Sequence, residues 1–225
     1  LTTVLDSKER VSSTQIAGLA TTNFVYDSHG RLSTMTQGTR NTILAYDSDG
    51  RLSALTDPLD RKTSFAYDSD GHLLATTLPD LRVIGYKHDS NGNLISITPP
   101  GKSAHDFDYT GVNQLSEYVP PFVSGTGLTS YAYNLDRNIT KMTRPDGKVI
   151  SFDYDDAGRV SSVVTPTETI DYTYSSTTGN LTAASITSGE ALAYGYNGPL
   201  EASTKWTGTI DGTVSRGYND NFWAT

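Results

Sequence analysis

The fold is decided by a stretch that recurs along the chain, Phe24-Val25-Tyr26-Asp27-Ser28-His29-Gly30-Arg31-Leu32, then Leu44-Ala45-Tyr46-Asp47-Ser48-Asp49-Gly50-Arg51-Leu52, then Phe65-Ala66-Tyr67-Asp68-Ser69-Asp70-Gly71-His72-Leu73. Its central Tyr, or the residue in that place, recurs at positions 26, 46, 67, 88, 109, 133, 154, 174, 196 and 218, in steps of 20 to 24 residues. Self-similarity at a nearly fixed period is the mark of a repeat protein. The sequence therefore predicts about ten copies of one structural unit.

Each copy has the alternation of a β-hairpin. Phe24 and Tyr26 lie two residues apart, so in a strand they share one face, whereas Val25 takes the other face. A turn follows at once. Asp27 has a short side chain that accepts hydrogen bonds from backbone amides, and Gly30 readily adopts the positive φ of a type I turn with a bulge. We therefore predict one hairpin per copy, with the Arg and Leu of the motif opening the return strand.

A second set of turn-forming residues separates each hairpin from the next. These residues are Gln37-Gly38, Asp57-Pro58, Pro79-Asp80, Pro99-Pro100-Gly101 and Pro145-Asp146-Gly147. One period thus holds two strands and two turns, which gives roughly 20 antiparallel strands in one meander. A filled barrel cannot hold so many strands, and an open twisted sheet of this length curls. The predicted fold is all-β, with tandem antiparallel β-hairpin repeats of about 21 residues forming a long curled or spiralling strip.

The repeat array fills the chain. Stepping back one period from the first full motif reaches Leu5, which belongs to a degenerate copy. We therefore expect a single repeat array over residues 1–225 that is truncated at both ends, as an internal fragment of a longer protein. The longest step runs from Tyr109 to Tyr133, and it predicts a lengthened loop at about 116–130 within the array.

The residues of the motif are interpreted as structural repeat positions rather than as a binding site. Their aromatic side chains would stack between neighbouring hairpins as a ladder that helps to bury a shared face. A carbohydrate-stacking surface is the alternative interpretation of the same rings. The positions that follow the motif most closely are Tyr26, Asp27, Gly30, Arg31, Leu32, Tyr46, Asp47, Gly50, Arg51, Leu52, Tyr67, Asp68, Gly71, Leu73, Tyr154, Asp155, Gly158 and Arg159.

The sequence offers no motif for catalysis or for a metal or cofactor. The segments Asp47–Gly50 and Asp68–Gly71 partly resemble calcium loops, but they lack the further acidic ligands and the final Glu of an EF-hand. Turn capping is the favoured interpretation, and weak calcium binding at these turns stays open. The four His lie outside any zinc motif, and no Gly-x-Ser-x-Gly elbow occurs. We predict no catalytic, cofactor-binding or metal-binding residues, and no enzyme activity.

The composition of the chain argues against some classes of binding partner. The formal net charge of −8 lacks the basic surface that nucleic acids require, so we expect no nucleic-acid partner. The apolar runs are short, so we expect no membrane insertion by this segment. Cys is absent, which excludes disulfides. A targeting signal would lie outside the fragment.

The Tyr-Asp-x-x-Gly-Arg-Leu units resemble the YD repeats of the bacterial Rhs family, the insecticidal toxin complexes and the teneurins. The resemblance covers nearly the whole chain and is strongest from Tyr26 to Leu32, from Tyr46 to Leu52, from Tyr67 to Leu73 and from Tyr154 to Val160. It implies a large hollow shell built from a β-strip, in a secreted or cell-surface protein. The implied function is that of a structural wall segment enclosing a polypeptide cargo such as a C-terminal toxin domain.

The alternative that the same resemblance implies is a teneurin-like cell-surface scaffold, which mediates adhesion or binds a glycan or a surface protein. In either case the first partner of this segment is the remainder of the same shell polypeptide.

Overall fold

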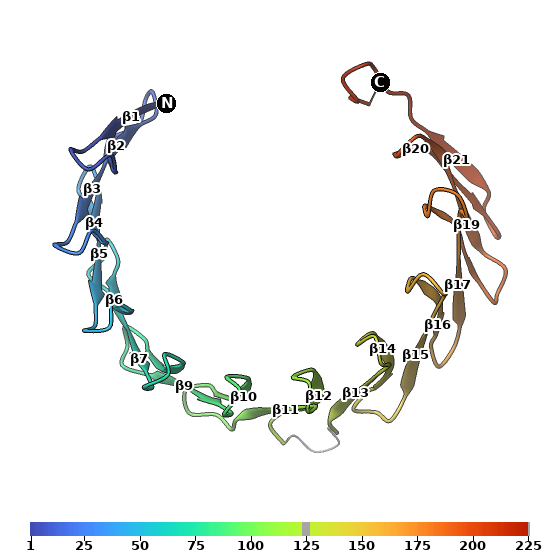
Figure 1. Cartoon of the computed structure of the whole chain (residues 1–225), viewed down its shortest axis with the longest axis horizontal. Coiled ribbons are helices and arrows are strands. Elements are labelled where there is room, and N and C mark those ends of the chain that lie inside the picture. Colours follow the sequence, from blue (N-terminus) through green and yellow to red (C-terminus); the bar gives the residue numbers. More distant parts are fainter. Residues whose placement is uncertain (123–126, 225) are drawn as a thin grey trace. The chain divides into compact units, whose positions relative to one another are not determined.

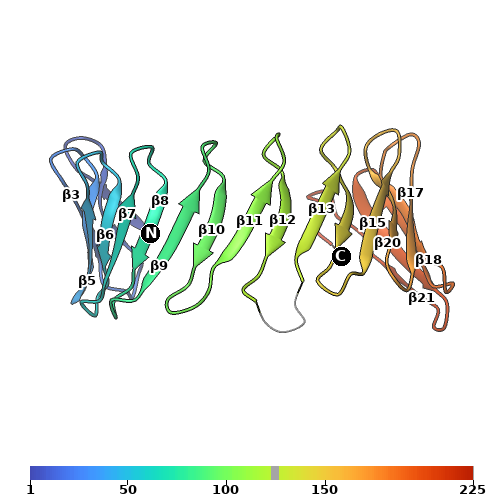
Figure 2. The same cartoon turned by 90° about the horizontal axis from the view of Figure 1, so that it is seen from below.

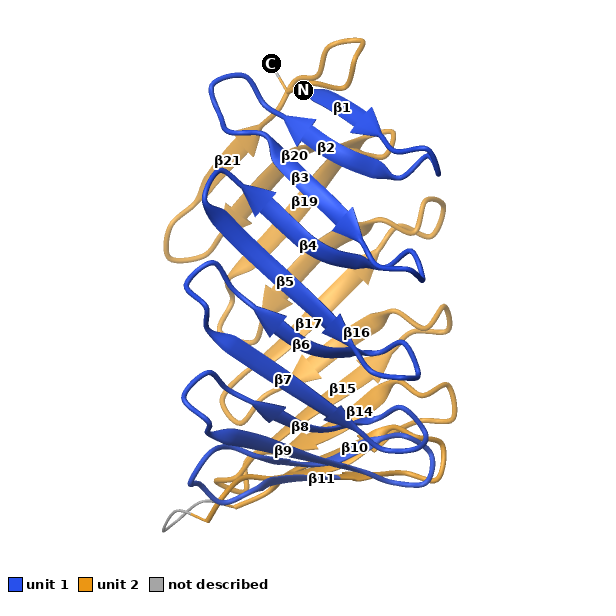
Figure 3. Cartoon of the chain, turned by 90° about the vertical axis from the view of Figure 1, so that its left-hand side faces the viewer, with its two compact units in different colours: residues 1–107 blue, residues 108–225 orange. Residues whose placement is uncertain are grey.

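The computed structural model describes residues 1–122 and 127–224. The described residues form 21 β-strands and no helix, and each strand is a short extended piece of the repeat (Figure 1). Within this part of the chain, no helical segment has the length and apolar character needed to cross a bilayer. The chain divides into two compact units, unit 1 over Leu1–Phe107 and unit 2 over Asp108–Thr225 (Figure 3).

Unit 1 is a meander in which each strand pairs antiparallel with the next strand in sequence. Its strands are β1 Thr2–Leu5, β2 Val11–Gln15, β3 Thr22–Tyr26, β4 Leu32–Gln37, β5 Arg40–Tyr46, β6 Leu52–Thr56, β7 Lys62–Tyr67, β8 Leu73–Thr77, β9 Val83–His88 and β10 Leu94–Thr98. β11, His105–Tyr109, contains the boundary between the units and pairs with β10.

Unit 2 repeats the same pairing from β12 onward. Its strands are β12 Leu115–Val119, β13 Thr129–Tyr133, β14 Ile139–Thr143, β15 Val149–Tyr154, β16 Val160–Val164, β17 Thr169–Tyr174, β18 Leu181–Ile186, β19 Ala191–Asn197, β20 Leu200–Thr207 and β21 Gly212–Ser215. In each unit the turns follow two opposite edges of the strip (Figure 2). The predicted all-β strip of tandem antiparallel hairpins is therefore confirmed.

The predicted loop at about 116–130 lies in part outside the described residues, since 123–126 are not among them. Its described flanks contain most of β12 and the start of β13.

The turn between β3 and β4 has the predicted geometry. The amide of Gly30 donates to the carbonyl of Asp27 over 3.0 Å, and the amide of Asp27 donates to the carbonyl of Arg31 over 2.8 Å. Gly30 has a φ of 83°, and the strand register shifts between Val25 and Tyr26. These are the hydrogen bonds of a three-residue hairpin loop with Gly at the left-handed position, and the register shift is a separate bulge at Ser33 of β4.

The strip is one layer thick in each unit, so its core is thin. Along β3, Phe24 and Tyr26 are half-buried whereas Val25 is exposed, which is the predicted alternation. Among the described residues, those that are buried by their exposed fraction are Ala54 at 7%, Thr76 at 8% and Ser96 at 5%. No large side chain in the described ranges is completely buried. Contacts between neighbouring hairpins must therefore carry much of the stability that a deep core supplies elsewhere.

Candidate functional site

The motif Asp organises the turn at the tip of its own hairpin. One carboxylate oxygen of Asp27 accepts the amides of His29 and Arg31, each over 2.9 Å, and the other accepts the Nε of Arg31 over 2.8 Å. The pKa of Asp27 is lowered, and the main cause is the hydrogen bond that the Arg31 amide donates to its carboxylate. Asp6 makes the same contacts, and the side-chain hydrogen bond from Arg10 lowers its pKa to about 2.

The motif Arg reaches from its own turn to the next hairpin. The guanidinium of Arg31 lies over the ring of Tyr46, with its central carbon 4.3 Å from the ring centroid. A cation positioned in this way is attracted by the negative face of the ring. The same contact joins the pairs Arg10 and Tyr26, Arg51 and Tyr67, and Arg159 and Tyr174. One side chain therefore braces a turn and also packs on the following repeat.

The motif Tyr returns a contact in the opposite direction. The hydroxyl of Tyr46 donates to the carbonyl of Leu32 over 2.8 Å, at the start of the return strand of the preceding hairpin. Other Tyr residues at this repeat position make the equivalent bond: Tyr26, Tyr67, Tyr133, Tyr154, Tyr174, Tyr196 and Tyr218. Two contacts thus join consecutive hairpins: the Arg guanidinium over the Tyr ring, and the Tyr hydroxyl bonded to a backbone carbonyl. We call them together the hairpin joint.

The motif Gly serves the joint as well as the turn. A Cβ built on Gly50 would lie 3.2 Å from Nη1 of Arg31 in the preceding hairpin. Gly50 also has a φ of 86°, which side chains bearing a Cβ disfavour. Two separate constraints, backbone conformation and the space taken by the guanidinium, therefore act on this position.

Sequence reasoning placed the motif residues at turns and between repeats, and it expected ring-on-ring stacking. The structure instead packs an Arg guanidinium on the ring at four of the joints. In the described part of the chain, the ring stack that the structure records joins His72 and His88. At the joint of Tyr154 the Arg position holds Asn138, and Tyr154 keeps its hydroxyl bond to the carbonyl of Ile139. The role of Arg was missed because its aromatic partner lies in the following repeat.

The two segments that resemble calcium loops use their carboxylates within the protein. Asp47 accepts the Nε of Arg51 over 2.8 Å, and Asp49 accepts an Nη of the same guanidinium over 2.7 Å. In the second segment Asp68 pairs with His72. Over the residues that the structure describes, no cluster of three or more His, Asp or Glu is placed to hold a metal ion.

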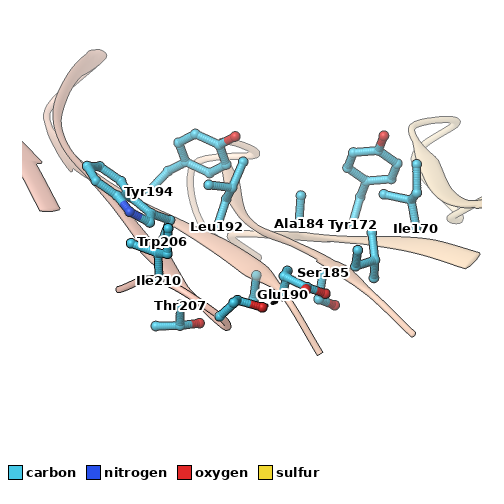
Figure 4. A pocket seen from close by; sticks show the side chains of 13 residues that line it. Ile170, Tyr172, Ala184, Ser185, Glu190, Leu192, Tyr194, Trp206, Thr207 and Ile210 are labelled. Atoms are coloured by element: carbon cyan, nitrogen blue, oxygen red, sulfur yellow. Dashed lines mark hydrogen bonds between the residues drawn. The ribbon is translucent and has the colours of Figure 1, made fainter. Parts of the chain in front are cut away.

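A groove on unit 2 is the second candidate site (Figure 4). Its volume is about 590 Å³, within the range of small-ligand pockets. Tyr172 stands on β17, and across the small side chain of Ala184 stand Tyr194 on β19 and Trp206 on β20. Glu190 lies at the edge of the groove. The remaining lining residues are Ile170, Ser185, Ile186, Ala191, Leu192, Thr207, Thr209 and Ile210.

Hydrogen bonds to the carboxylate of Glu190, at the edge of this groove, favour its charged form. Glu190 accepts the hydroxyl of Ser188 over 2.7 Å and that of Thr209 over 3.4 Å. The bond from Ser188 is the largest cause that lowers the pKa of Glu190. The groove thus combines aromatic rings, aliphatic side chains and one carboxylate, a set that suits a ligand with both an apolar face and hydroxyl or cationic groups.

Comparison with known proteins gives a family and a fold. The family model of the Teneurin YD-shell matches residues 1–224. The crystal structure of TcdB2-TccC3-Cdc42 is similar, with 14% identity over 94% of this chain and 14% of that chain, and a TM-score of 0.73. A Tc holotoxin pore structure from Photorhabdus luminescens is 14% identical over 97% of this chain and 16% of that chain, with a TM-score of 0.60. No curated protein matches the chain. The chain thus spans a small part of the length of these relatives.

Proposed function

Since the chain belongs to the teneurin YD-shell family, we propose that it is a wall segment of a shell that encloses a polypeptide cargo such as a C-terminal toxin domain. The observation that carries this proposal is the hairpin joint. A guanidinium and a hydroxyl cross between consecutive hairpins in both units, so that a single-layer strip is braced without a second sheet. A thin wall that keeps its form while leaving space on either side is what enclosure requires.

Two further features support enclosure. In β3, β5 and β7 the motif rings share one half-buried face, and the opposite face, which includes Val25, Ile43 and Ala66, is more exposed. One similar solved structure is a complex of TcdB2, TccC3 and Cdc42, and another, which also names TccC3, is a Tc holotoxin pore. We infer that the remainder of the shell polypeptide is the first partner of this chain, that the protein is secreted or on the cell surface, and that the segment contributes no catalysis.

Protease protection of the cargo tests this proposal in the full-length protein. The variant Arg31→Ala/Arg51→Ala removes the guanidinium contact from two joints, and Arg61→Ala is the matched control. Arg61 pairs with Asp57 in a turn of the same kind, but its side chain is 60% exposed and the structure records no ring beneath it. We expect the C-terminal domain to resist protease in the wild type and the control and to be digested faster in the joint variant. Equal digestion in all three proteins would contradict enclosure by this wall.

The groove on unit 2 favours a second candidate function, that of a surface scaffold that binds a glycan or a protein. The flat rings of Trp206 and Tyr172 can stack on sugar rings, and the carboxylate of Glu190 can accept hydrogen bonds from sugar hydroxyls. A glycan array with the wild type and with Trp206→Ala and Tyr172→Ala separates this function from a purely structural one. Glycan binding that both variants lose supports it, whereas an array without hits removes the glycan form of this candidate.

A further inference from the structure

One joint of unit 1 departs from the pattern at both of its positions. His72 stands at the position that Arg occupies at four other joints, and His88 stands at the position that Tyr occupies in those joints. Their rings stack with centroids 5.0 Å apart and planes 22° from parallel. The pair joins hairpin β7–β8 to hairpin β9–β10 at the place where Arg51 and Tyr67 join the hairpins before it. A cation–ring contact has thus been exchanged for a contact between two titratable rings.

The two rings differ in their surroundings. Nδ1 of His72 lies 3.2 Å from a carboxylate oxygen of Asp68, so a proton on His72 has a counter-ion. Nδ1 of His88 is buried and has no hydrogen-bond partner among the described residues. A proton at that nitrogen would be a buried donor without an acceptor.

Four charged groups surround the pair. The turn of His72 contributes Asp68 and the exposed Asp70, and the following turn contributes Asp89, adjacent in sequence to His88. From the preceding hairpin, Arg51 donates to the carbonyl of Asp68 over 2.9 Å and adds a positive charge on that side. One carboxylate thus pairs directly with His72, whereas the structure records no acceptor for Nδ1 of His88.

We propose that the His72–His88 pair makes this joint acid-labile, so that protonation of both imidazoles opens hairpin β7–β8 from hairpin β9–β10 at mildly acidic pH. Imidazole in water titrates at a pH of about 6.5, whereas Arg stays charged at every physiological pH. In the closed joint two protonated rings would hold their positive charges face to face, with centroids 5.0 Å apart, and opening the joint separates them. Protonation of both rings therefore favours the open joint, and linkage limits the effect to about tenfold per proton for each unit fall in pH.

The absence of Cys from the chain allows a local test in the full chain. Thr76 in β8 is 8% exposed and pairs with Ile84 of β9 across the contact that the His joint spans, and Ala54 in β6 is 7% exposed and pairs with Ser64 of β7 across the contact that Arg51 and Tyr67 span. Thr76→Cys and Ala54→Cys, made separately, report opening of the two joints by their rate of reaction with 4,4′-dithiodipyridine. The ratio of the two rates cancels the intrinsic dependence of thiol reactivity on pH.

We expect the ratio of the Thr76→Cys rate to the Ala54→Cys rate to rise between pH 7.5 and pH 5.5, by up to about tenfold per pH unit. The variant His72→Arg/His88→Tyr introduces the pair found at four other joints and should make the ratio flat. The converse variant Arg51→His/Tyr67→His should transfer the acid sensitivity to Ala54→Cys. A flat ratio in the wild type, an equal rise in His72→Arg/His88→Tyr, or an unchanged response after the transfer would each overturn the proposal. If His72→Arg/His88→Tyr does not fold, the transfer variant decides alone.

Discussion

Replacing Gly50 by Ala tests whether the joint, and not the turn alone, requires glycine. Gly50 and Gly71 occupy the same place in consecutive hairpins of unit 1 and have φ values of 86° and 90°. They differ in what a Cβ would meet. At Gly50 it would lie 3.2 Å from Nη1 of Arg31, whereas at Gly71 it would lie 3.8 Å from Nη1 of Arg51, at ordinary van der Waals distance. Gly71→Ala is therefore the matched control.

The expected magnitudes follow from these distances. A side chain with a Cβ costs about 1–2 kcal/mol in the left-handed region, and both variants incur this cost. Gly50→Ala also displaces the guanidinium of Arg31 from the ring of Tyr46, on which it is centred at 4.3 Å. An exposed cation–ring contact is worth about 0.5–1 kcal/mol. We therefore expect Gly50→Ala to destabilise the protein by about 1.5–3 kcal/mol and Gly71→Ala by about 1–2 kcal/mol.

Urea denaturation of the full chain, followed by far-UV circular dichroism, measures both losses. The difference should vanish in an Arg31→Ala background, because the guanidinium that Gly50→Ala displaces is then gone. Equal losses for Gly50→Ala and Gly71→Ala in the wild-type background would refute the idea that Arg31 restricts Gly50. A difference that persists without Arg31 would show that some other contact causes it.

Three further variants probe the turn and the joint. Leu81→Gly should stabilise the protein by up to about 1 kcal/mol in urea, because Leu81 is 80% exposed and holds a φ of 67°; destabilisation would contradict this. Tyr46→Phe should destabilise the protein by about 1–2 kcal/mol, because it removes the hydroxyl that donates to the carbonyl of Leu32 over 2.8 Å. An unchanged urea midpoint would show that water replaces this hydrogen bond. Asp27→Asn should lower stability at pH 7 and make the thermal midpoint less sensitive to acid. The pKa of Asp27 lies below its usual 3.8, so its contribution is complete above that pH and is lost as the pH falls through the lower value. An equally steep acid response in the variant would contradict this role.

The hairpin, its two faces and its tip were predictable because they depend on residues close together in the sequence. The spacing of Phe24 and Tyr26 set the faces, and the Asp27 to Gly30 segment set the turn, as the structure confirms. These are local features governed by strand alternation and by the backbone freedom of glycine.

The remaining features depend on hydrogen bonds and packing that the spacing of residues does not specify. Leu81 adopts the left-handed conformation although its residue type disfavours it, because its amide bonds the carbonyl of Leu78 over 2.9 Å within a turn that requires a positive φ there. The contact of Arg31 with Tyr46 joins two repeats, so neither repeat read alone reveals it. The groove on unit 2 arises where the small Ala184 lies between larger side chains of neighbouring strands, which depends on strand register.

The joints also have a direction, and this has a consequence for how damage spreads. At a joint that has both contacts, the Arg guanidinium packs on the ring of the following hairpin and the Tyr hydroxyl donates to a carbonyl of the preceding one. Loss of Arg31 removes a brace from its own turn and uncovers the ring of Tyr46, whereas loss of the Tyr46 hydroxyl leaves the ion pair of Arg31 with Asp27 in place. In a nearest-neighbour array, stability is close to a sum of units and of the interfaces between them. An Arg variant should therefore weaken one unit and one interface together, and a Tyr→Phe variant should weaken the interface alone.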